Sequence, residues 1–451
     1  MQANTPEVLV HKEAPAPVSL WQATLYWLRL GLLSFGGPAG QISMMHQDLV
    51  ENRRWISERR YLHALNYTMV LPGPEAQQLA TYIGWLLHGV KGGLIAGLLF
   101  ILPSFFLLAA LTWTYLTFGD VPLVQGLLYG IKPAVTAIVL FAAWRIGSRA
   151  LRNWALRIIS TLAFVAIFVF SVPFPLIVLA AAGIGYIGSR LAPQFFQLGG
   201  GHQGEKMDYG PALIDEHTPL PEHARFSWKR MLIILFSGLT LFMLPLLVLA
   251  LVSDLNGTLA TMGWFFTKAA LVTFGGAYAV LPYVYQGAVE QYGWLTATQM
   301  IDGLALGETT PGPLIMIVAF VGFVGGWTSA LFGPDQLALA GLTAAAVVTY
   351  YTFLPSFMFI LLGAPSVEAT RHNIGFTAPL TGITAAVVGV ILNLALFFAW
   401  HVLWPDGFEG RFELFSALLG CAAFIALFRF KVGVIPVIAA CACLGLSYSL
   451  I

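Results

Sequence analysis

SFGG at residues 34–37 returns as TFGG at residues 273–276, an offset of 239 positions (273 − 34). The same offset carries the PGP motif of residues 72–74 onto that of residues 311–313. Uncommon residues that stay in register over a long stretch indicate an internal repeat. The sequence therefore predicts two related halves in one chain.

The composition is too apolar for a soluble protein. Of the 451 residues, 58% are hydrophobic and 10% are charged, whereas soluble domains carry about 25% charged residues. Residues 92–118 and 229–252 are apolar runs that exceed the roughly 20 residues needed to cross a bilayer. We therefore predict an all-α polytopic membrane protein. A net charge of +1 gives no sign of a nucleic-acid partner.

A polar stretch separates the two halves and sets the predicted domain boundaries. We expect this stretch to be a mobile cytoplasmic linker, followed by a transmembrane helix that has no counterpart in the first half. The predicted order is an N-terminal repeat over residues 1–191, the linker over 192–228, the extra transmembrane helix over 229–257 and a C-terminal repeat over 258–451.

The distribution of Lys and Arg predicts that the two repeats are inserted in opposite orientations. Cytoplasmic loops are enriched in these residues, and the first half gathers arginines in two loops. They are Arg53, Arg54, Arg59 and Arg60, then Arg145, Arg149, Arg152 and Arg157. The equivalent residues 286–299 hold no Lys or Arg. Conversely, Arg429 and Lys431 occupy a second-half turn whose counterpart is uncharged. One extra helix supplies the odd number of crossings that an inverted repeat requires.

The FGG and PGP motifs interrupt apolar segments. Glycine and proline end helices, and irregular backbone at membrane depth survives only when it is buried in protein or lines a wet cavity. We expect re-entrant hairpins whose broken ends meet near the midplane and offer unpaired N–H groups to a small anion. Close helix packing at the glycines is the alternative. The four segments are residues 20–50, 61–88, 259–290 and 298–327.

The predicted substrate site combines these backbone groups with hydroxyls and two cations. Arg29 and Lys268 are equivalent at the offset of 239 and lie five residues before the Ser or Thr of each break. A cation at membrane depth is costly unless it is used or hydrated, and snorkelling to the interface is the alternative. The predicted substrate-binding residues are Arg29, Ser34, Gly36, Gly37, Pro72, Gly73, Pro74, Lys268, Thr273, Gly275, Gly276, Pro311, Gly312 and Pro313.

Two carboxylates flank the PGP breaks and are predicted to couple transport to protons. Glu75 follows the first break and Glu308 precedes the second. A carboxylate removed from water can hold a proton near neutral pH, whereas a structural hydrogen-bonding role is the alternative. Asp302 is a further candidate, and His63 occupies its equivalent position.

Signatures of ATP hydrolysis and of common catalytic sites are missing. The sequence lacks a GxxxxGKS/T loop, a GxSxG elbow and an HExxH motif. We therefore predict no catalytic residue, no metal and no cofactor. The three histidines of the linker and the three cysteines of the chain lack the spacing of a metal site or disulfide framework; they are His202, His217 and His223, and Cys421, Cys441 and Cys443.

The duplicated FGG-to-PGP unit resembles the chromate transporter family over nearly the whole chain. The resemblance is carried by SFGGPAGQI at 34–42, RRWISERRYLHALNYTMVLPGPEAQQLATYIGW at 53–85, TFGGAYAVLPY at 273–283 and LALGETTPGPL at 304–314. It implies a secondary active transporter of a bacterial inner membrane that exports chromate with the proton gradient as driving force and confers chromate resistance. Sulfate is a second candidate substrate. Ala277 in place of Pro38, and Leu314 in place of Glu75, imply an asymmetric site.

Two other functions stay open at this point. A passive anion channel would use the same break chemistry without coupling to protons. A membrane-embedded enzyme acting on a lipid would need clustered His, Asp and Glu residues, which the apolar segments largely lack. The expected partners are the oxyanion, protons and membrane lipids, and a homodimer is left open.

Overall fold

Helices make up nearly all of the regular structure, as the composition predicts. The computed structural model describes residues 15–35, 37–196, 209–216, 218, 219, 221–253, 257–369 and 377–450. Within these residues there is no β-strand, and the one isolated bridge joins Ile56 to Ile214. Gly36, His202 and His217 lie outside the described residues.

The first half begins with short helices on either side of the FGG and PGP motifs and continues with longer ones. The elements are α1 (Leu20–Leu33), α2 (Gly37–His46), the π-helix η1 (Gln47–Asn52), α3 (Glu58–Val70), α4 (Glu75–Phe118), α5 (Pro122–Ala150), α6 (Trp154–Phe168), α7 (Phe174–Leu191) and α8 (Pro193–Phe196).

The second half follows the same order after a short turn and an additional helix. The elements are η2 (Glu222–Ala224), α9 (Trp228–Ser253), α10 (Thr258–Leu271), α11 (Ala277–Tyr285), the π-helix η3 (Gln286–Gln291), α12 (Ala297–Thr309), η4 (Leu314–Met316), α13 (Ile317–Thr328), η5 (Pro334–Gln336), α14 (Leu337–Ala369), α15 (Thr377–Leu403), α16 (Leu414–Phe428) and α17 (Val434–Ser449).

Six helices among the described residues are long and apolar enough to cross a membrane. This confirms the prediction of an all-α polytopic membrane protein. The opposite orientation of the two halves stays a prediction. The candidate spans are Glu75–Phe118, Pro122–Ala150, Phe174–Leu191, Trp228–Leu251, Pro334–Glu368 and Ala378–Leu403.

Helix boundaries recur at the offset of 239 found in the sequence. α3 and α12 begin and end at equivalent residues, and so do the π-helices η1 and η3. Capping explains why α3 and α12 begin where they do. Ser57 Oγ accepts a hydrogen bond from the N–H of Arg60 at 3.3 Å, and Thr296 Oγ1 accepts one from Gln299 at 3.1 Å.

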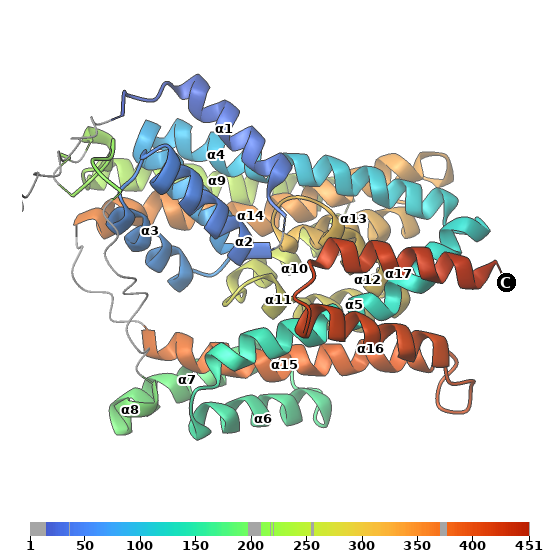
Figure 1. Ribbon diagram of the computed structural model, residues 1–451. Coiled ribbons are helices and arrows are strands. Elements are labelled where there is room, and N and C mark those ends of the chain that lie inside the picture. The colour runs from blue at the N-terminus through green and yellow to red at the C-terminus, as the bar shows by residue number, and fades with distance from the viewer. Residues whose placement is uncertain are drawn as a thin grey trace, which may run out of the picture.

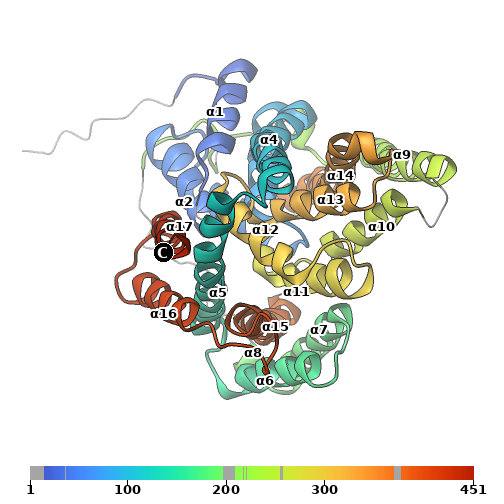
Figure 2. The same cartoon turned by 90° about the vertical axis from the view of Figure 1, so that its right-hand side faces the viewer.

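The helices form two groups, and each half of the chain contributes to both. Figure 1 shows α1–α4, α9, α10, α13 and α14 in one group, with α5–α8 and α15–α17 in the other. α5 packs against α15, α16 and α17, while α15 packs against α5, α6 and α7. In Figure 2, α11 and α12 lie between the two groups. The halves are therefore interleaved rather than placed side by side.

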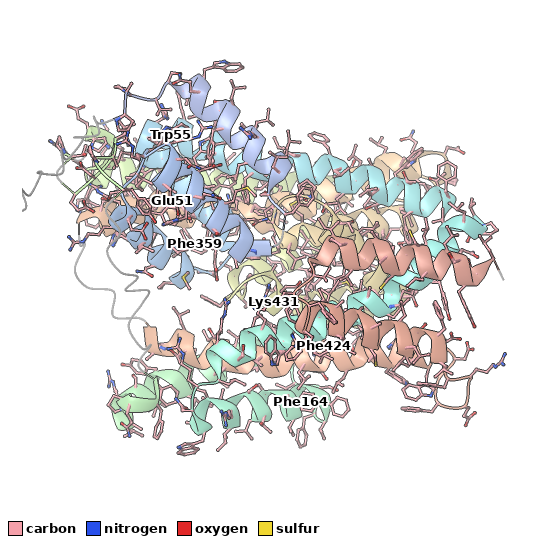
Figure 3. The ribbon with its side chains drawn as sticks, in the orientation of Figure 1. Glu51, Trp55, Phe164, Phe359, Phe424 and Lys431 are labelled. Atoms are coloured by element: carbon pink, nitrogen blue, oxygen red, sulfur yellow. The ribbon has the colours of Figure 1, made fainter. Side chains whose placement is uncertain are left out.

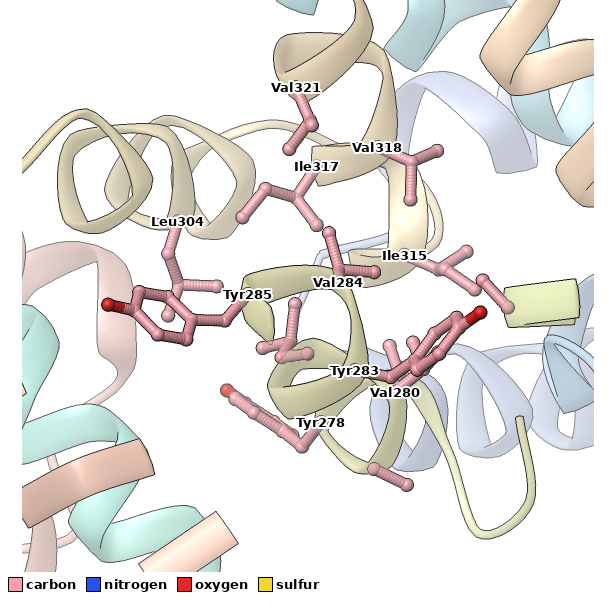
Figure 4. Close-up of a cluster of buried hydrophobic side chains, with 14 of the residues drawn as sticks. Tyr278, Val280, Tyr283, Val284, Tyr285, Leu304, Ile315, Ile317, Val318 and Val321 are labelled. Atoms are coloured by element: carbon pink, nitrogen blue, oxygen red, sulfur yellow. The ribbon is translucent and has the colours of Figure 1, made fainter. Parts of the chain in front are cut away.

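The largest apolar core surrounds α11, which is buried along its whole length. Figure 4 shows Val280 and Val284 of α11 in one cluster with Ile315 and Ile317, and these four side chains are at most 1% exposed. This core holds the second-half FGG break next to the second-half PGP break.

The α6–α7 and α16–α17 hairpins are short. α6 and α16 have 15 residues each, which gives a length of about 22 Å against roughly 30 Å for a bilayer core. Figure 3 shows Lys431, on the turn between α16 and α17, well inside the length of the molecule, whereas Glu51 and Trp55 lie near one end. The turn that carries Lys431 therefore lies nearer to the middle of the molecule than Glu51 and Trp55 do.

Part of the linker is docked on the helices. Ser57 N–H donates to the carbonyl of Ile214 at 2.9 Å. Arg60, which is 5% exposed, donates to the carbonyl of Asp215 at 2.9 Å and to the carboxylate of Glu368 at 3.0 Å. These bonds tie the linker to the start of α3, and Arg60 in turn joins α3 to α14, which differs from the mobile linker that the sequence predicted.

Candidate functional site

The broken helix ends of the two halves meet through two hydrogen bonds. The N–H of Gly73 donates to the carbonyl of Thr273 at 2.8 Å, and the N–H of Gly312 donates to the carbonyl of Ser34 at 2.8 Å. The two bonds are equivalent at the offset of 239. Each PGP break is therefore bound to the FGG break of the other half, and the structure brings the predicted residues together.

The PGP glycines are closely packed. A Cβ on Gly73 would collide with the hydroxyl of Ser356 and lie 2.7 Å from Nε2 of Gln78. A Cβ on Gly312 would lie 2.7 Å from the Cβ of Ser104. These glycines allow close helix approach, so the packing alternative describes them better than an open anion cradle does. The flanking prolines Pro72, Pro74, Pro311 and Pro313 line the same junction.

The FGG glycines face open space instead. A Cβ on Gly37 or Gly276 would have no atom within 4 Å, and one on Gly275 would meet only Thr384 Oγ1, at 3.9 Å. Gly37 and Gly276 have φ of +72° and +97°, which side chains rarely adopt. Backbone beside open space at a helix start is the arrangement that binds an anion. Of the predicted breaks, the FGG pair fits this role.

Buried polar atoms without a partner surround the breaks. Six side-chain oxygens have no hydrogen bond to any described residue, although buried polar atoms normally have one. Such a set fits a polar ligand. The atoms are Ser34 Oγ, Gln41 Oε1, Gln77 Oε1, Gln78 Oε1, Ser104 Oγ and Ser356 Oγ.

These glutamines were missed by the sequence-based prediction. The sequence did contain a signal for them. Gln41, Gln77 and Gln78 lie in largely apolar first-half segments, and the residues equivalent to them in the second half are apolar. The equivalent residues are Val280, Met316 and Ile317. The site is therefore polar on the first-half side. Thr273 adds to this asymmetry, since its hydroxyl donates to the carbonyl of Ala269 at 2.6 Å, whereas that of Ser34 is unpaired.

A cation and a tyrosine accompany Glu308. The hydroxyl of Tyr278, two residues after Gly276, donates to Glu308 Oε1. Arg145 of α5 interacts electrostatically with both Glu308 and Tyr278. The sequence assigned Arg145 to a cytoplasmic loop, but α5 continues to Ala150 and carries it within the helix. Arg145 is thus a site candidate that sequence reasoning missed.

The other predicted charged residues lie in different surroundings. Arg29 is exposed on the outer face of α1, beside the exposed Leu25, Leu28 and Leu32. This placement fits snorkelling better than anion binding. Lys268 is partly buried on α10. Glu75, the first residue of α4, is partly buried and has no hydrogen bond to a described residue.

The family model described as chromate transporter matches residues 21–186 and 260–446, which is more than half of the chain. The chain belongs to the chromate transporter family. The two stretches matched by the chromate transporter model lie one in each predicted half. No solved structure matches the chain.

Similar proteins cover nearly the whole chain. A chromate transport protein of Cupriavidus metallidurans is 31% identical over 414 residues, which are 92% of this chain and 89% of that protein. A chromate transport protein of Pseudomonas aeruginosa is 33% identical over 444 residues, 96% of this chain and 93% of that protein. The uncharacterized transporter YwrA of Bacillus subtilis matches 132 residues at 29% identity, 29% of this chain and 74% of that protein. Membership of the chromate transporter family makes this chain a membrane transport protein and not an enzyme.

Proposed function

We propose that this protein is a secondary active transporter that exports chromate across a bacterial inner membrane in exchange for protons. The names of the two long relatives support chromate as the substrate. The carboxylates at the breaks, Glu75 and Glu308, support the coupling to protons. Sulfate is a second candidate substrate, because it is also a tetrahedral dianion.

The observation that carries the proposal is the unequal packing of equivalent helices. In the second half, α11 packs against α7 and α15, and α12 packs against α5, α15 and α17. Their first-half equivalents, α2 and α3, make no comparable packing against α5, α7, α15 or α17 among the described residues. One pair of re-entrant helices is therefore covered by the second group of helices, and its equivalent is not.

Side-chain exposure follows the same division. Tyr278 on α11 is 8% exposed, whereas the equivalent Ala39 on α2 is exposed. Ala305 on α12 is 1% exposed, whereas the equivalent Asn66 on α3 is exposed. The uncovered face of α2 and α3 also carries the exposed Ser43. A face with these residues can meet water on one side of the membrane.

This asymmetry supports a carrier over a passive channel. Two inverted repeats held in two different arrangements can exchange those arrangements, which uncovers a central site first on one side and then on the other. A channel needs a path open to both sides at once. In this structure α11 and α12 are covered, so the site is reached from the side of α2 and α3. The charge distribution assigns that side to the cytoplasm.

The residues at the breaks suit an oxyanion. Open backbone at Gly37 and Gly276, the unpaired hydroxyl of Ser34 and the guanidinium of Arg145 are all groups that bind oxyanions. Glu308, near Arg145, is a candidate for the proton. In an exchange of chromate for protons, this carboxylate carries the proton on the step on which no anion is bound and gives it up on the step on which the anion crosses. Glu75 is the second candidate for the proton.

Transport into proteoliposomes with an imposed pH gradient tests this function. With the membrane potential held at zero and an acidic lumen, the exchanger should accumulate labelled chromate above its external concentration, and an uncoupler should abolish the accumulation. Equilibration without accumulation, unaffected by the uncoupler, would identify a channel. Competition by unlabelled sulfate in the same vesicles measures the preference between the two dianions.

A further inference from the structure

The extra helix α9 leaves most of its surface uncovered by protein. It packs against α10 and α14, and Figure 2 shows it at the outer edge of the molecule beside these two helices. Only 6% of its most apolar stretch is buried, whereas the other candidate spans have 28–67% buried. A helix this apolar and this uncovered lies against the lipid.

The start of α9 lies where the apolar part of the membrane meets its headgroup layer. The ring centroids of Phe226 and Trp228 are 5.3 Å apart, and the two side chains are 40% and 67% exposed. Exposed aromatic rings gather at that boundary. From Met231 to Ser253, α9 carries no charged residue, whereas the linker before Phe226 is polar. The linker end of α9 is therefore an interfacial surface.

Three cations flank this aromatic pair in the sequence. Arg225, Lys229 and Arg230 are exposed, and none of them forms an ion pair with another described residue. Arg230 donates a hydrogen bond to the carbonyl of Glu222 at 2.9 Å, but a guanidinium has five N–H donors. These cations can therefore still bind an anion.

A pocket between α4, α9, α14 and η2 opens beside these cations. Arg225 and Arg230 line it, and so do apolar side chains from the three helices. Along α9, Ile234 lies about one turn beyond Arg230, so the pocket continues from the charged headgroup level toward the apolar core. The apolar lining includes Trp85 and Val90 of α4, Met231 and Ile234 of α9, and Leu361 and Leu362 of α14.

A break in α4 shapes the pocket. The helix departs from helical φ and ψ at Gly89, whose φ is +63°. Next to this break the carbonyl of Leu86 accepts a hydrogen bond from Nε2 of His223 at 3.2 Å, and the His223 ring packs edge-on against Trp85. These contacts hold η2 against α4 and so bring Arg225, two residues after His223, to the pocket.

We propose that this pocket binds an anionic phospholipid, with its phosphate paired to Arg225 and Arg230 and an acyl chain along α9 and α14. Guanidinium groups bind phosphate through two parallel hydrogen bonds, and basic pockets between membrane helices bind anionic headgroups. A lipid with a choline headgroup offers the same phosphate, but its ammonium group would be repelled by the three cations. A free phosphate ion would leave the apolar lining uncovered.

A lipid bound here would clamp the linker to both halves of the chain. α4 belongs to the first half, α14 to the second and η2 to the linker. Trp85 lies ten residues after Glu75, the first residue of α4, so the pocket is about 15 Å along that helix from the PGP break. The lipid site is therefore separate from the breaks, and its occupancy does not depend on the direction or the coupling of transport.

Thermal unfolding of the purified protein in detergent, with and without added phosphatidylglycerol, tests this site. The lipid should raise the melting temperature by at least about 3 °C, and the double variant Arg225→Gln, Arg230→Gln should lose at least half of that rise. Arg157→Gln is the matched control and should keep the full rise. Arg157 is also an exposed cation near an exposed tryptophan, Trp154, but it does not line this pocket.

Further measurements identify the occupant. Phosphatidylcholine and glycerol phosphate, at the same concentration, should each give less than half of the rise, because the first has no net charge and the second has no acyl chain. Ile234→Trp should also give less than half of it, because the larger side chain would fill the apolar part of the pocket while both arginines stay in place.

An equal rise for the unaltered protein and the arginine double variant would overturn the lipid site, and so would an equal loss in Arg157→Gln. A full rise with glycerol phosphate would instead assign the pocket to a free phosphate ion. A second copy of the chain is the other occupant that could cover α9. Cross-linking between copies through Leu239→Cys, an exposed position on α9, with no rise on adding phosphatidylglycerol, would identify that copy and overturn the lipid.

Discussion

Gly73 lies directly against the side chain of Ser356, a residue from the other half of the chain. Its equivalent Gly312 lies against Ser104, and the two serines are themselves equivalent, 252 positions apart (356 − 104). Each PGP break is thus fitted against α4 or α14 of the opposite half. These paired contacts hold the two halves in register at the site.

Adding a methyl group at this contact should destabilise the fold. Gly73→Ala and Gly312→Ala should each lower the free energy of unfolding by about 1–3 kcal/mol, because the Cβ would overlap the facing serine. Gly333→Ala is the matched control, since Gly333 also has a positive φ, +89°, but has no atom within 4 Å of its Cβ position. Thermal unfolding in detergent measures the difference. Equal melting temperatures for all three variants would show that the contact is loose.

Larger side chains at the FGG breaks should block transport instead. Gly37→Leu or Gly276→Leu should abolish chromate transport because the added side chain would fill the open space beside the backbone. The variant proteins should still fold, although a leucine at a positive φ lowers the free energy of unfolding by about 1–2 kcal/mol. Gly333→Leu controls for that cost. Normal chromate transport by folded Gly37→Leu protein would exclude an anion site at that position.

Arg145 should contribute more to anion binding than Arg29 does. Arg145→Gln should weaken chromate binding at least tenfold, about 1.4 kcal/mol, because its guanidinium interacts with the Glu308 group. Arg149→Gln, an exposed position one turn further along α5, is the matched control. Arg29→Gln should bind chromate normally, since Arg29 faces outward. Weakened binding in Arg29→Gln with normal binding in Arg145→Gln would restore the sequence-based assignment.

The positions of the breaks could be predicted from sequence because a repeated motif and the conformational limits of Gly and Pro fix them. Which break is open and which is packed could not be predicted, because it depends on Ser104 and Ser356, residues far away in the chain. Arg145 was assigned to a loop because a charged residue after an apolar run gives the same sequence pattern whether the helix ends before it or continues past it. The docked linker was missed because its bonds run through backbone atoms, such as the carbonyls of Ile214 and Asp215.

The two halves should be inserted in opposite orientations. Arg59 and Thr298 are equivalent and both exposed, so single cysteines at these positions in a cysteine-free protein report the two faces. With a membrane-impermeant thiol reagent added to intact cells, Thr298→Cys should be labelled and Arg59→Cys protected. Labelling of both cysteines, or of neither until the cells are permeabilised, would contradict the inverted arrangement.

The central claim is that the two halves exchange their packing during transport. Cross-linking of two equivalent residue pairs tests this claim most directly. Phe174 N–H donates to Gln286 Oε1 at 3.2 Å and joins α7 to η3. Gln47 is equivalent to Gln286 at the offset of 239, and Val434 begins α17 as Phe174 begins α7, but no hydrogen bond joins Val434 to Gln47 among the described residues. With a short bis-thiol reagent, the Phe174→Cys, Gln286→Cys pair should cross-link at rest and less during chromate transport, while the Val434→Cys, Gln47→Cys pair should cross-link more. Unchanged yields for both pairs during active transport would contradict the exchange.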